Sequence, residues 1–197
     1  MSSIHDAAWL NLEETLKENL STEKAWQKII NFQANLNPKD YWKLIKELDI
    51  ISEQDEIKEW LEQIVTDTPL PKNVVALWIG IAKLWDSDND KEFYAIYLTG
   101  SDTYNPENAD WAVEPSYDPT EKYIIPDALN LIDTILKTDE DNYSFNDWII
   151  PIAYCSLNIS NIMNNKLNTN AFTKFNKSLF VTVGYDDGDF IAIEPIT

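Results

Sequence analysis

The segment DSDNDKE, which runs from Asp86 to Glu92, has an acidic side chain at every second residue. Acids at loop positions one, three and five also begin a calcium-binding EF-hand loop. That loop needs glycine at position six and glutamate at position twelve, where this chain has Lys91 and Tyr97. Because apolar residues flank the segment on both sides, we interpret it as a hairpin turn between two strands.

Two further groups of acids could bind a metal ion or act as an acid–base pair. Paired carboxylates hold a divalent cation, or serve as acid and base in a glycosidase, only where they converge in space. Spacing along the chain does not show convergence, and carboxylates in turns are usually solvated. The acids of the two groups are Asp102, Glu107, Asp110, Glu114 and Asp118, then Asp186, Asp187 and Asp189.

Nucleophilic and zinc chemistry have few candidate residues. Cys155 is the only cysteine and lies in the apolar run WIIPIAYCSL, so we expect it in the core, and His5 is the only histidine. A Cys–His pair, a Ser–His–acid triad and a histidine-containing zinc site are therefore not expected. We predict no metal, no cofactor and no catalytic residue.

The charge of the chain is its most unusual feature. It has 34 acidic and 15 basic residues, a net charge of −19, and every basic residue is lysine. Arginine is the preferred side chain for phosphate, so its absence and the negative charge argue against direct binding of DNA or RNA. A strongly negative protein attracts basic proteins instead. The alternative is that the acidity only keeps the protein soluble.

Aromatic residues are interleaved with the acids between Ser101 and Lys122. Trp111 is expected to pack inward, whereas Tyr104 and Tyr117 are expected at the surface. Aromatic and acidic side chains together could anchor a basic partner there. We predict that the partner-binding residues are Asp86, Asp88, Asp90, Glu92, Asp102, Tyr104, Asp110, Glu114 and Tyr117.

Residues 1–68 have apolar side chains at helical spacing, which predicts four helices. Residues that cap helix N-termini precede these apolar stripes. The predicted starts are Ser21 or Thr22, Asn37 with Pro38 after it, and Ser52 with Asp55.

An antiparallel strand pair is predicted next. Residues 73–85 form a long apolar run rich in β-branched and aromatic side chains, which we interpret as a buried strand, with a buried helix as the alternative. Residues 91–100 are the expected partner strand across the DSDNDKE turn. The segment 101–122 contains three prolines, so we expect a loop with a short strand at Trp111.

The C-terminal part predicts two helices and a hairpin. The helices are expected to start at Pro126 and Ser144, and an asparagine-rich linker over 158–176 follows them. Asp187-Gly188 is the strongest hairpin signal in the chain and predicts a two-residue connection between closing strands.

Together these elements predict an α+β fold in a single domain, residues 1–197. A helical N-terminal third (1–68) precedes a mostly antiparallel sheet with helices packed on one face (69–197). No apolar stretch is long enough for a membrane span, and the first residues lack the basic flank and apolar run of a signal peptide. We therefore expect a cytoplasmic protein with no membrane contact.

Two stretches, YAIYLTGSDTYNPENADWAVEPSY and VGYDDGDF, resemble small bacterial cytoplasmic immunity proteins that accompany polymorphic toxins. The resemblance lies in a strand ending at Gly100, an acidic loop reaching Asp110–Ala112 and a terminal hairpin starting at Gly184, about a third of the chain. It implies a non-catalytic α+β protein that neutralises a toxin by binding it.

The predicted function is therefore that of an acidic, non-catalytic immunity protein. It would occlude the active cleft of a basic toxin that acts on nucleic acid. The alternatives are a carboxylate-dependent hydrolase and a structural or regulatory subunit of an oligomer. A hydrolase would show convergent carboxylates in a concave site, whereas a binding protein would show an open acidic surface.

The failed EF-hand match can be tested by calcium titration. Calorimetry on the purified protein is expected to show no calcium binding tighter than about millimolar, the weak end of EF-hand sites, because Lys91 places a positive charge where the cation would lie. Micromolar binding that is lost in the Asp86→Ala variant would show that the segment is a calcium loop after all.

Overall fold

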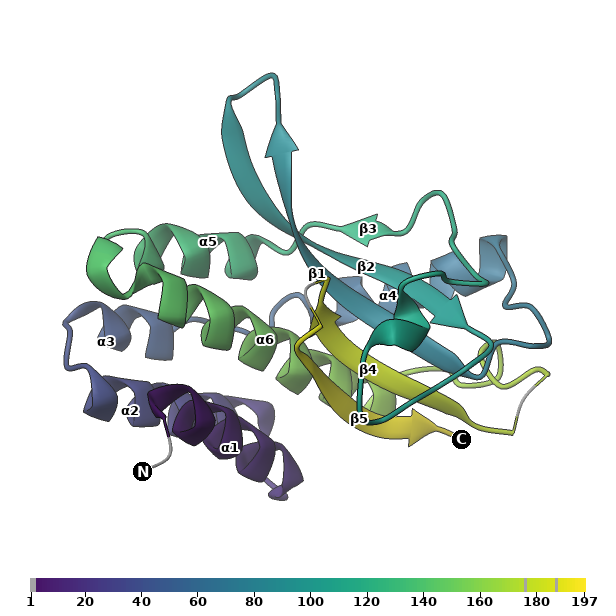
Figure 1. Ribbon diagram of the computed structural model, residues 1–197, viewed down its shortest axis with the longest axis horizontal. Coiled ribbons are helices and arrows are strands. Elements are labelled where there is room, and N and C mark those ends of the chain that lie inside the picture. The colour runs from purple at the N-terminus through teal and green to yellow at the C-terminus, as the bar shows by residue number, and fades with distance from the viewer. Residues whose placement is uncertain (1–2, 176, 187) are drawn as a thin grey trace. The chain divides into compact units, whose positions relative to one another are not determined.

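The computed structural model of the 197-residue chain describes residues 3–175, 177–186 and 188–197. These residues form helices and one five-stranded sheet, so the predicted α+β class is confirmed (Figure 1). None of the helices within the described ranges is long and apolar enough to cross a membrane. The elements in chain order are α1 (Ile4–Lys17), α2 (Thr22–Leu36), α3 (Tyr41–Lys46), α4 (Gln54–Asp67), β1 (Ala76–Asp86), β2 (Lys91–Ser101), the 3-10 helix η1 (Asp110–Ala112), β3 (Tyr123–Ile124), α5 (Asp127–Leu136), α6 (Glu140–Asn165), β4 (Leu179–Tyr185) and β5 (Phe190–Ile196).

The chain divides into two compact units. The first unit comprises Met1–Ser52 and Asp127–Asn158, and it contains α1, α2, α3, α5 and most of α6. The second comprises Glu53–Pro126 and Ile159–Thr197, and it contains α4, the end of α6 and all the strands of the sheet. The last of the four expected N-terminal helices, α4, thus belongs to the unit that holds the sheet.

The helix starts differ from the predictions in two places. Ser21 caps α2 as expected, since its hydroxyl accepts from the backbone N–H of Lys24 at 3.4 Å. Asn37 instead ends α2, because its own N–H is bonded to the Gln33 carbonyl at 3.0 Å. Ser52 caps nothing, because its hydroxyl donates back to the Asp49 carbonyl at 2.9 Å. Both N-cap predictions are therefore wrong.

A buried carboxylate, Asp139, ties together the segments of the first unit. Lys39 and the Tyr41 hydroxyl donate to its two oxygens at 3.1 and 3.0 Å, and the Asn142 amide donates to both at 3.0 Å. Burial opposes ionisation of Asp139, but these hydrogen bonds outweigh it and hold its pKa below the ordinary value. This acid is therefore a structural tether between α3 and the start of α6.

The asparagine-rich segment is helical over its first part. Helix α6 runs from Glu140 to Asn165, so its start lies before the expected Ser144 and its end lies inside the expected linker. The Asn158 amide donates to the Tyr154 carbonyl at 3.0 Å, and the Asn161 amide reaches α4 at Gln54 with a 2.8 Å hydrogen bond. These side-chain bonds give asparagine a partner inside a helix, where it usually competes with the backbone.

The sheet has the strand order β3-β2-β1-β4-β5. Neighbouring strands are antiparallel except for β1 and β4, which are parallel, with Ala76 opposite Phe180 and Ile81 opposite Tyr185. The expected β1–β2 pair is confirmed from Ala76 and Ser101 down to the turn. The sheet is therefore mixed, because the C-terminal hairpin docks beside β1 in the parallel sense.

Side chains of β1 alternate between the two faces of the sheet. Leu77, Ile79 and Ile81 are buried on the face where α4 lies (Figure 1). Trp78 lies on the opposite face and packs edge to face against Trp111 of η1, with 5.7 Å between ring centroids. The prediction that Trp111 packs inward is confirmed, but the strand expected at this residue is wrong, since η1 is a 3-10 helix.

The C-terminal hairpin has a longer connection than predicted. Strand β4 ends at Tyr185 and β5 begins at Phe190, so residues 186–189 connect them, and the Tyr185 N–H donates to the Asp189 carbonyl at 2.9 Å. The expected Asp187 lies outside the described residues. Gly188 has φ +107°, as the hairpin prediction requires, and its N–H donates to the Tyr185 carbonyl at 3.1 Å.

Gly188 is expected to matter through its backbone alone. A Cβ at this position would meet no atom within 4 Å, so a side chain costs stability only through the strained φ of +107°. Gly188→Val should lower the free energy of unfolding by about 1 kcal/mol or more in urea titrations. Gly188→Asn should cost less, because asparagine tolerates positive φ better than a β-branched residue does. Equal unfolding midpoints for Val, Asn and the parent glycine would contradict this.

Candidate functional site

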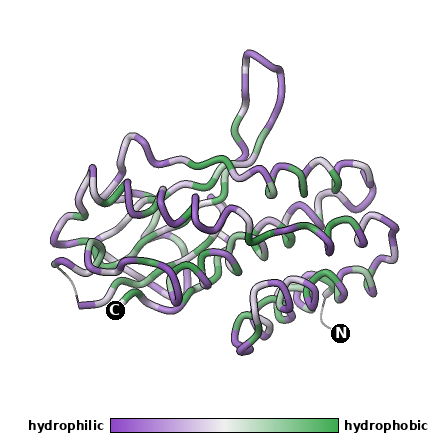
Figure 2. Tube along the Cα trace, turned by 180° about the vertical axis from the view of Figure 1, so that it is seen from behind, coloured by the Kyte–Doolittle hydropathy of each residue, from purple (hydrophilic) through white to green (hydrophobic). Residues whose placement is uncertain are grey.

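The β1–β2 hairpin extends beyond its neighbouring strands. Strand β4 pairs with β1 only as far as Ile81, and β3 pairs with β2 at Ile96 and Tyr97. Residues 82–95 therefore form a two-stranded projection, which we name the hairpin arm. Figure 1 shows the arm standing away from the rest of the sheet, and Figure 2 shows that its tip is hydrophilic while its base is hydrophobic.

The tip of the arm is a turn built around Asp86. One carboxylate oxygen of Asp86 accepts from the backbone N–H groups of Asp88 and Asn89 at 3.0 and 3.3 Å, and the other accepts from the Asn89 amide at 2.7 Å. These hydrogen bonds lower the pKa of Asp86, and the bond from the Asn89 side chain contributes most. The prediction of a hairpin turn is confirmed. Asp86 supports the turn, whereas Asp88 and Asp90 are exposed.

A tryptophan lies beside these acids with most of its surface in solvent. Trp85 is 58% exposed and lies directly across the strands from Glu92, which is also exposed. Directly opposed residues of an antiparallel pair lie on the same face of the ribbon. The arm thus presents a large aromatic side chain next to a carboxylate.

The predicted partner-binding residues fall into two separate groups. The arm holds Asp86, Asp88, Asp90 and Glu92 at one end of the β1–β2 pair, and the others follow Ser101 at the opposite end. The strands between these ends span about 30 Å at roughly 3.3 Å per residue. The second group, which does not share a surface with the first, comprises Asp102, Tyr104, Asp110, Glu114 and Tyr117.

Tyr117 is not a surface residue, which corrects the prediction. It is 3% exposed, its backbone bonds to Gly100 in both directions at 2.9 Å, and its hydroxyl donates to the Thr68 carbonyl at 2.6 Å. Burial raises its pKa. Tyr104 is half-buried and stacks on Phe180 with 4.2 Å between ring centroids. The alternation of acids and aromatic residues in the sequence could not show that the Tyr117 backbone pairs with Gly100 of β2.

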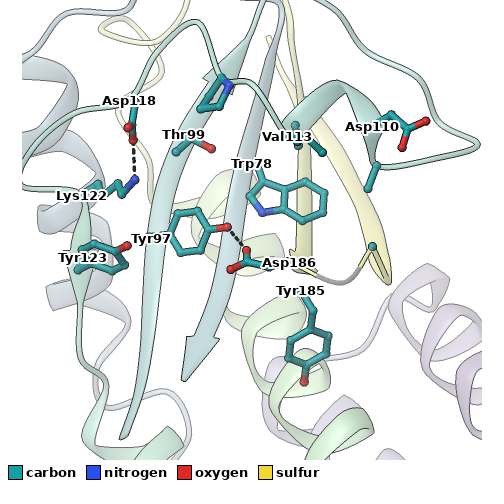
Figure 3. A pocket seen from close by; sticks show the side chains of 14 residues that line it. Trp78, Tyr97, Thr99, Asp110, Val113, Asp118, Lys122, Tyr123, Tyr185 and Asp186 are labelled. Atoms are coloured by element: carbon teal, nitrogen blue, oxygen red, sulfur yellow. Dashed lines mark hydrogen bonds and ion pairs between the residues drawn. The ribbon is translucent and has the colours of Figure 1, made fainter. Parts of the chain in front are cut away.

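The face of the sheet that carries Trp78 contains a hollow of about 540 Å³ (Figure 3). We name it the sheet-face hollow. Its walls come from β1, β2, the segment 109–123, the end of β4 at Tyr185, and residues Asp186 and Gly188. The lining residues are Trp78, Tyr97, Thr99, Ala109, Asp110, Ala112, Val113, Pro115, Asp118, Lys122, Tyr123, Tyr185, Asp186 and Gly188.

Two glycines make the floor of the hollow flat. Gly80 lies opposite Tyr97 on one side and opposite Gly184 on the other. A Cβ on Gly80 would lie 2.0 Å from Cζ of Tyr97, and a Cβ on Gly184 would lie 2.6 Å from the Trp78 ring. The rings of Trp78 and Tyr97 therefore lie over bare backbone, which is why glycine occupies the middle of two buried strands.

Tyr97 is the centre of a hydrogen-bond network in the hollow. Its hydroxyl donates to the carboxylate of Asp186 and is also bonded to Trp78 (Figure 3). Burial, followed by the hydrogen bond and charge of Asp186, raises the pKa of Tyr97. The hydroxyl therefore serves as a hydrogen-bond donor to Asp186.

The hollow already contains a cation from the chain itself. The ammonium of Lys122 lies 2.5 Å from the Asp118 carboxylate, and 5.5 and 5.6 Å from the ring centroids of Tyr97 and Tyr123. Aromatic faces attract cations at these distances. The hollow can therefore stabilise positive charge on its aromatic wall.

Sequence reasoning missed most of this site. Of the predicted partner-binding residues only Asp110 lines the hollow, together with Asp118 and Asp186 from the acidic groups considered for metal or acid–base chemistry. Asp118 is paired with Lys122, and Asp186 accepts from Tyr97, so neither is a free carboxylate. The sequence did contain one signal of the hollow. Gly80 and Gly184 each interrupt an apolar strand, and glycine inside a strand indicates that another group lies close to the backbone.

No three His, Cys, Asp or Glu side chains in the described part of the chain are grouped so that they could hold a metal ion. Cys155 is fully buried, as predicted, and burial raises the pKa of its thiol. Comparison of the chain with protein-family models, with curated proteins and with solved structures finds no match. The site must therefore be interpreted from its own geometry.

The raised pKa of Tyr97 predicts a pH-dependent loss of stability. A group whose pKa is higher in the folded than in the unfolded state stabilises the fold fully below its unfolded pKa of about 10, and this contribution is lost as pH rises above it. Urea unfolding at pH 8 and at pH 10.5 should show that stability falls less with pH in Tyr97→Phe than in the parent protein. Tyr123→Phe, at an exposed ring, should behave like the parent. The same fall in all three proteins would contradict the assigned network.

Proposed function

We propose that this chain is a non-catalytic acidic protein that binds a basic protein partner through the hairpin arm. The observation that carries the proposal is Trp85, which is 58% exposed on a projecting two-stranded arm and lies opposite Glu92. Tryptophan is enriched among the residues that dominate binding energy at protein interfaces.

The charge of the arm supports a basic partner. Four acids and one lysine occupy residues 86–92, in a chain of net charge −19 that has no arginine. Opposite charges on two proteins speed their encounter, and charge complementarity excludes other partners. The acids would thus steer association, while Trp85 would supply much of the affinity once its ring is buried.

The resemblance to immunity proteins suggests a specific form of this function. In that form the chain is a cytoplasmic bacterial protein, and the arm enters the active cleft of a toxin that acts on nucleic acid. A cleft that binds nucleic acid is basic, so it is complementary to an acidic arm. The mechanism is occlusion: the arm fills the cleft and excludes the substrate.

Binding kinetics of arm variants test the proposal. The partner used in the test is the basic toxin domain that we expect to be encoded beside the gene of this chain. Trp85→Ala should weaken binding at least about tenfold, mainly through faster dissociation, because it removes the aromatic anchor. Asp88→Lys with Glu92→Lys should slow association about fivefold or more at low salt, and the difference should shrink as salt screens the charges.

A matched control separates local from overall charge. Glu14→Lys with Glu59→Lys makes the same change in net charge at exposed positions of α1 and α4, so it should leave the association rate nearly unchanged. All of these variants should unfold at the same urea concentration as the parent, since the residues are exposed. Equal kinetics for arm and control variants would remove the arm from the interface. Hydrolytic activity of the purified chain would favour the hydrolase alternative.

A further inference from the structure

We propose that the sheet-face hollow is a binding site for a guanidinium group. The site is separate from the hairpin arm, because no residue from 82 to 95 lines the hollow. Its floor is the pair of rings Trp78 and Tyr97, and the Thr99 hydroxyl and the Asp186 carboxylate are among the polar groups that line it (Figure 3).

Thr99 indicates that a ligand completes the site. The residue is 4% exposed and lines the hollow, and within the described ranges its hydroxyl forms no hydrogen bond. The hydroxyl oxygen faces the open space of the hollow and is free to accept or donate a hydrogen bond there. A donor placed in the hollow would form a hydrogen bond with this oxygen.

The charge of the hollow indicates that the ligand is a cation. Asp110, Asp118, Asp186 and Lys122 are the charged residues that line it, and the Asp110 carboxylate points away from the two rings (Figure 3). Lys122 pairs with Asp118 near the rings of Tyr97 and Tyr123, so the charge of Asp118 is already neutralised by Lys122. Asp186 accepts from Tyr97, and a carboxylate can accept about four hydrogen bonds, so it retains acceptor capacity for a ligand.

The shape of the hollow favours guanidinium over ammonium. The floor is flat, because Gly80 and Gly184 let both rings lie against the backbone. A planar guanidinium can lie along aromatic walls and donate at its edge to two acceptors at once, whereas an ammonium is a compact point charge. The chain itself has no arginine, so no internal guanidinium competes for the site.

The test is a titration of the purified chain with four small probes. They are N-acetyl-arginine methylamide, free arginine, N-acetyl-lysine methylamide and N-acetyl-citrulline methylamide, followed by amide and indole proton–nitrogen NMR. The arginine probes should shift the Trp78 indole and the Thr99 amide signals. Citrulline, which has the same shape without the charge, should bind at least about tenfold more weakly, and lysine should bind more weakly than arginine.

Variants assign the binding to the named groups. Thr99→Val keeps the shape and breaks no hydrogen bond within the described residues, and it should weaken arginine binding about threefold. Asp186→Asn should weaken it about fivefold or more. Glu194→Gln removes a charge from the exposed side of β5 and should change nothing. Equal affinity for arginine and citrulline, unchanged binding in both hollow variants, or shifts outside the hollow only would overturn the proposal.

The same titration identifies the source of the guanidinium. Tighter binding of the blocked arginine would identify an arginine side chain within a peptide, whereas tighter binding of free arginine would identify a small metabolite. No protein partner is present in this experiment. Its outcome is therefore independent of the binding that the hairpin arm is proposed to carry.

Discussion

The register between β1 and β2 determines where every feature of the sheet lies. Asp86 opposite Lys91 fixes the turn, and the same register places Gly80 opposite Tyr97 and Trp78 opposite Thr99. Because side chains alternate with a period of two, a slip by one residue would move Trp78 to the helix-covered face and Ile79 into the hollow. The arm, the floor of the hollow and the core are thus three consequences of a single strand pairing.

The parallel contact between β1 and β4 adds what the hairpin alone cannot supply. It places Gly184 beside Gly80 and brings Asp186 to Tyr97, a residue 89 positions earlier in the chain. It also ends at Ile81, which leaves the outer half of the β1–β2 hairpin without a second neighbour. An isolated hairpin is marginally stable in water, so the arm depends on the sheet at its base for its order.

The elements that sequence reasoning predicted are those set by local chemistry. Asp86 forms its turn from hydrogen bonds within three residues, Ser21 caps the helix that follows it, and Gly188 adopts positive φ where asparagine or glycine is favoured. The N-caps predicted at Asn37 and Ser52 failed although they are local, but the failures in the sheet have a different cause. The parallel β1–β4 pairing, the burial of Tyr117 under Thr68 and the meeting of Tyr97 with Asp186 depend on contacts between residues far apart in sequence. No spacing rule contains that information.

The acids of this chain have different roles once their partners are known. Asp139 is held by Lys39 and Tyr41, and Asp118 by Lys122, so these charges serve the fold or the hollow. The arm carries its acids at the tip, about 20 Å along the strand from Gly80 at roughly 3.3 Å per residue. That separation exceeds the screening length of about 8 Å at physiological salt. The negative field of the tip is therefore largely screened at the hollow and cannot help to hold a cation there. Each site must rely on its own contacts for affinity.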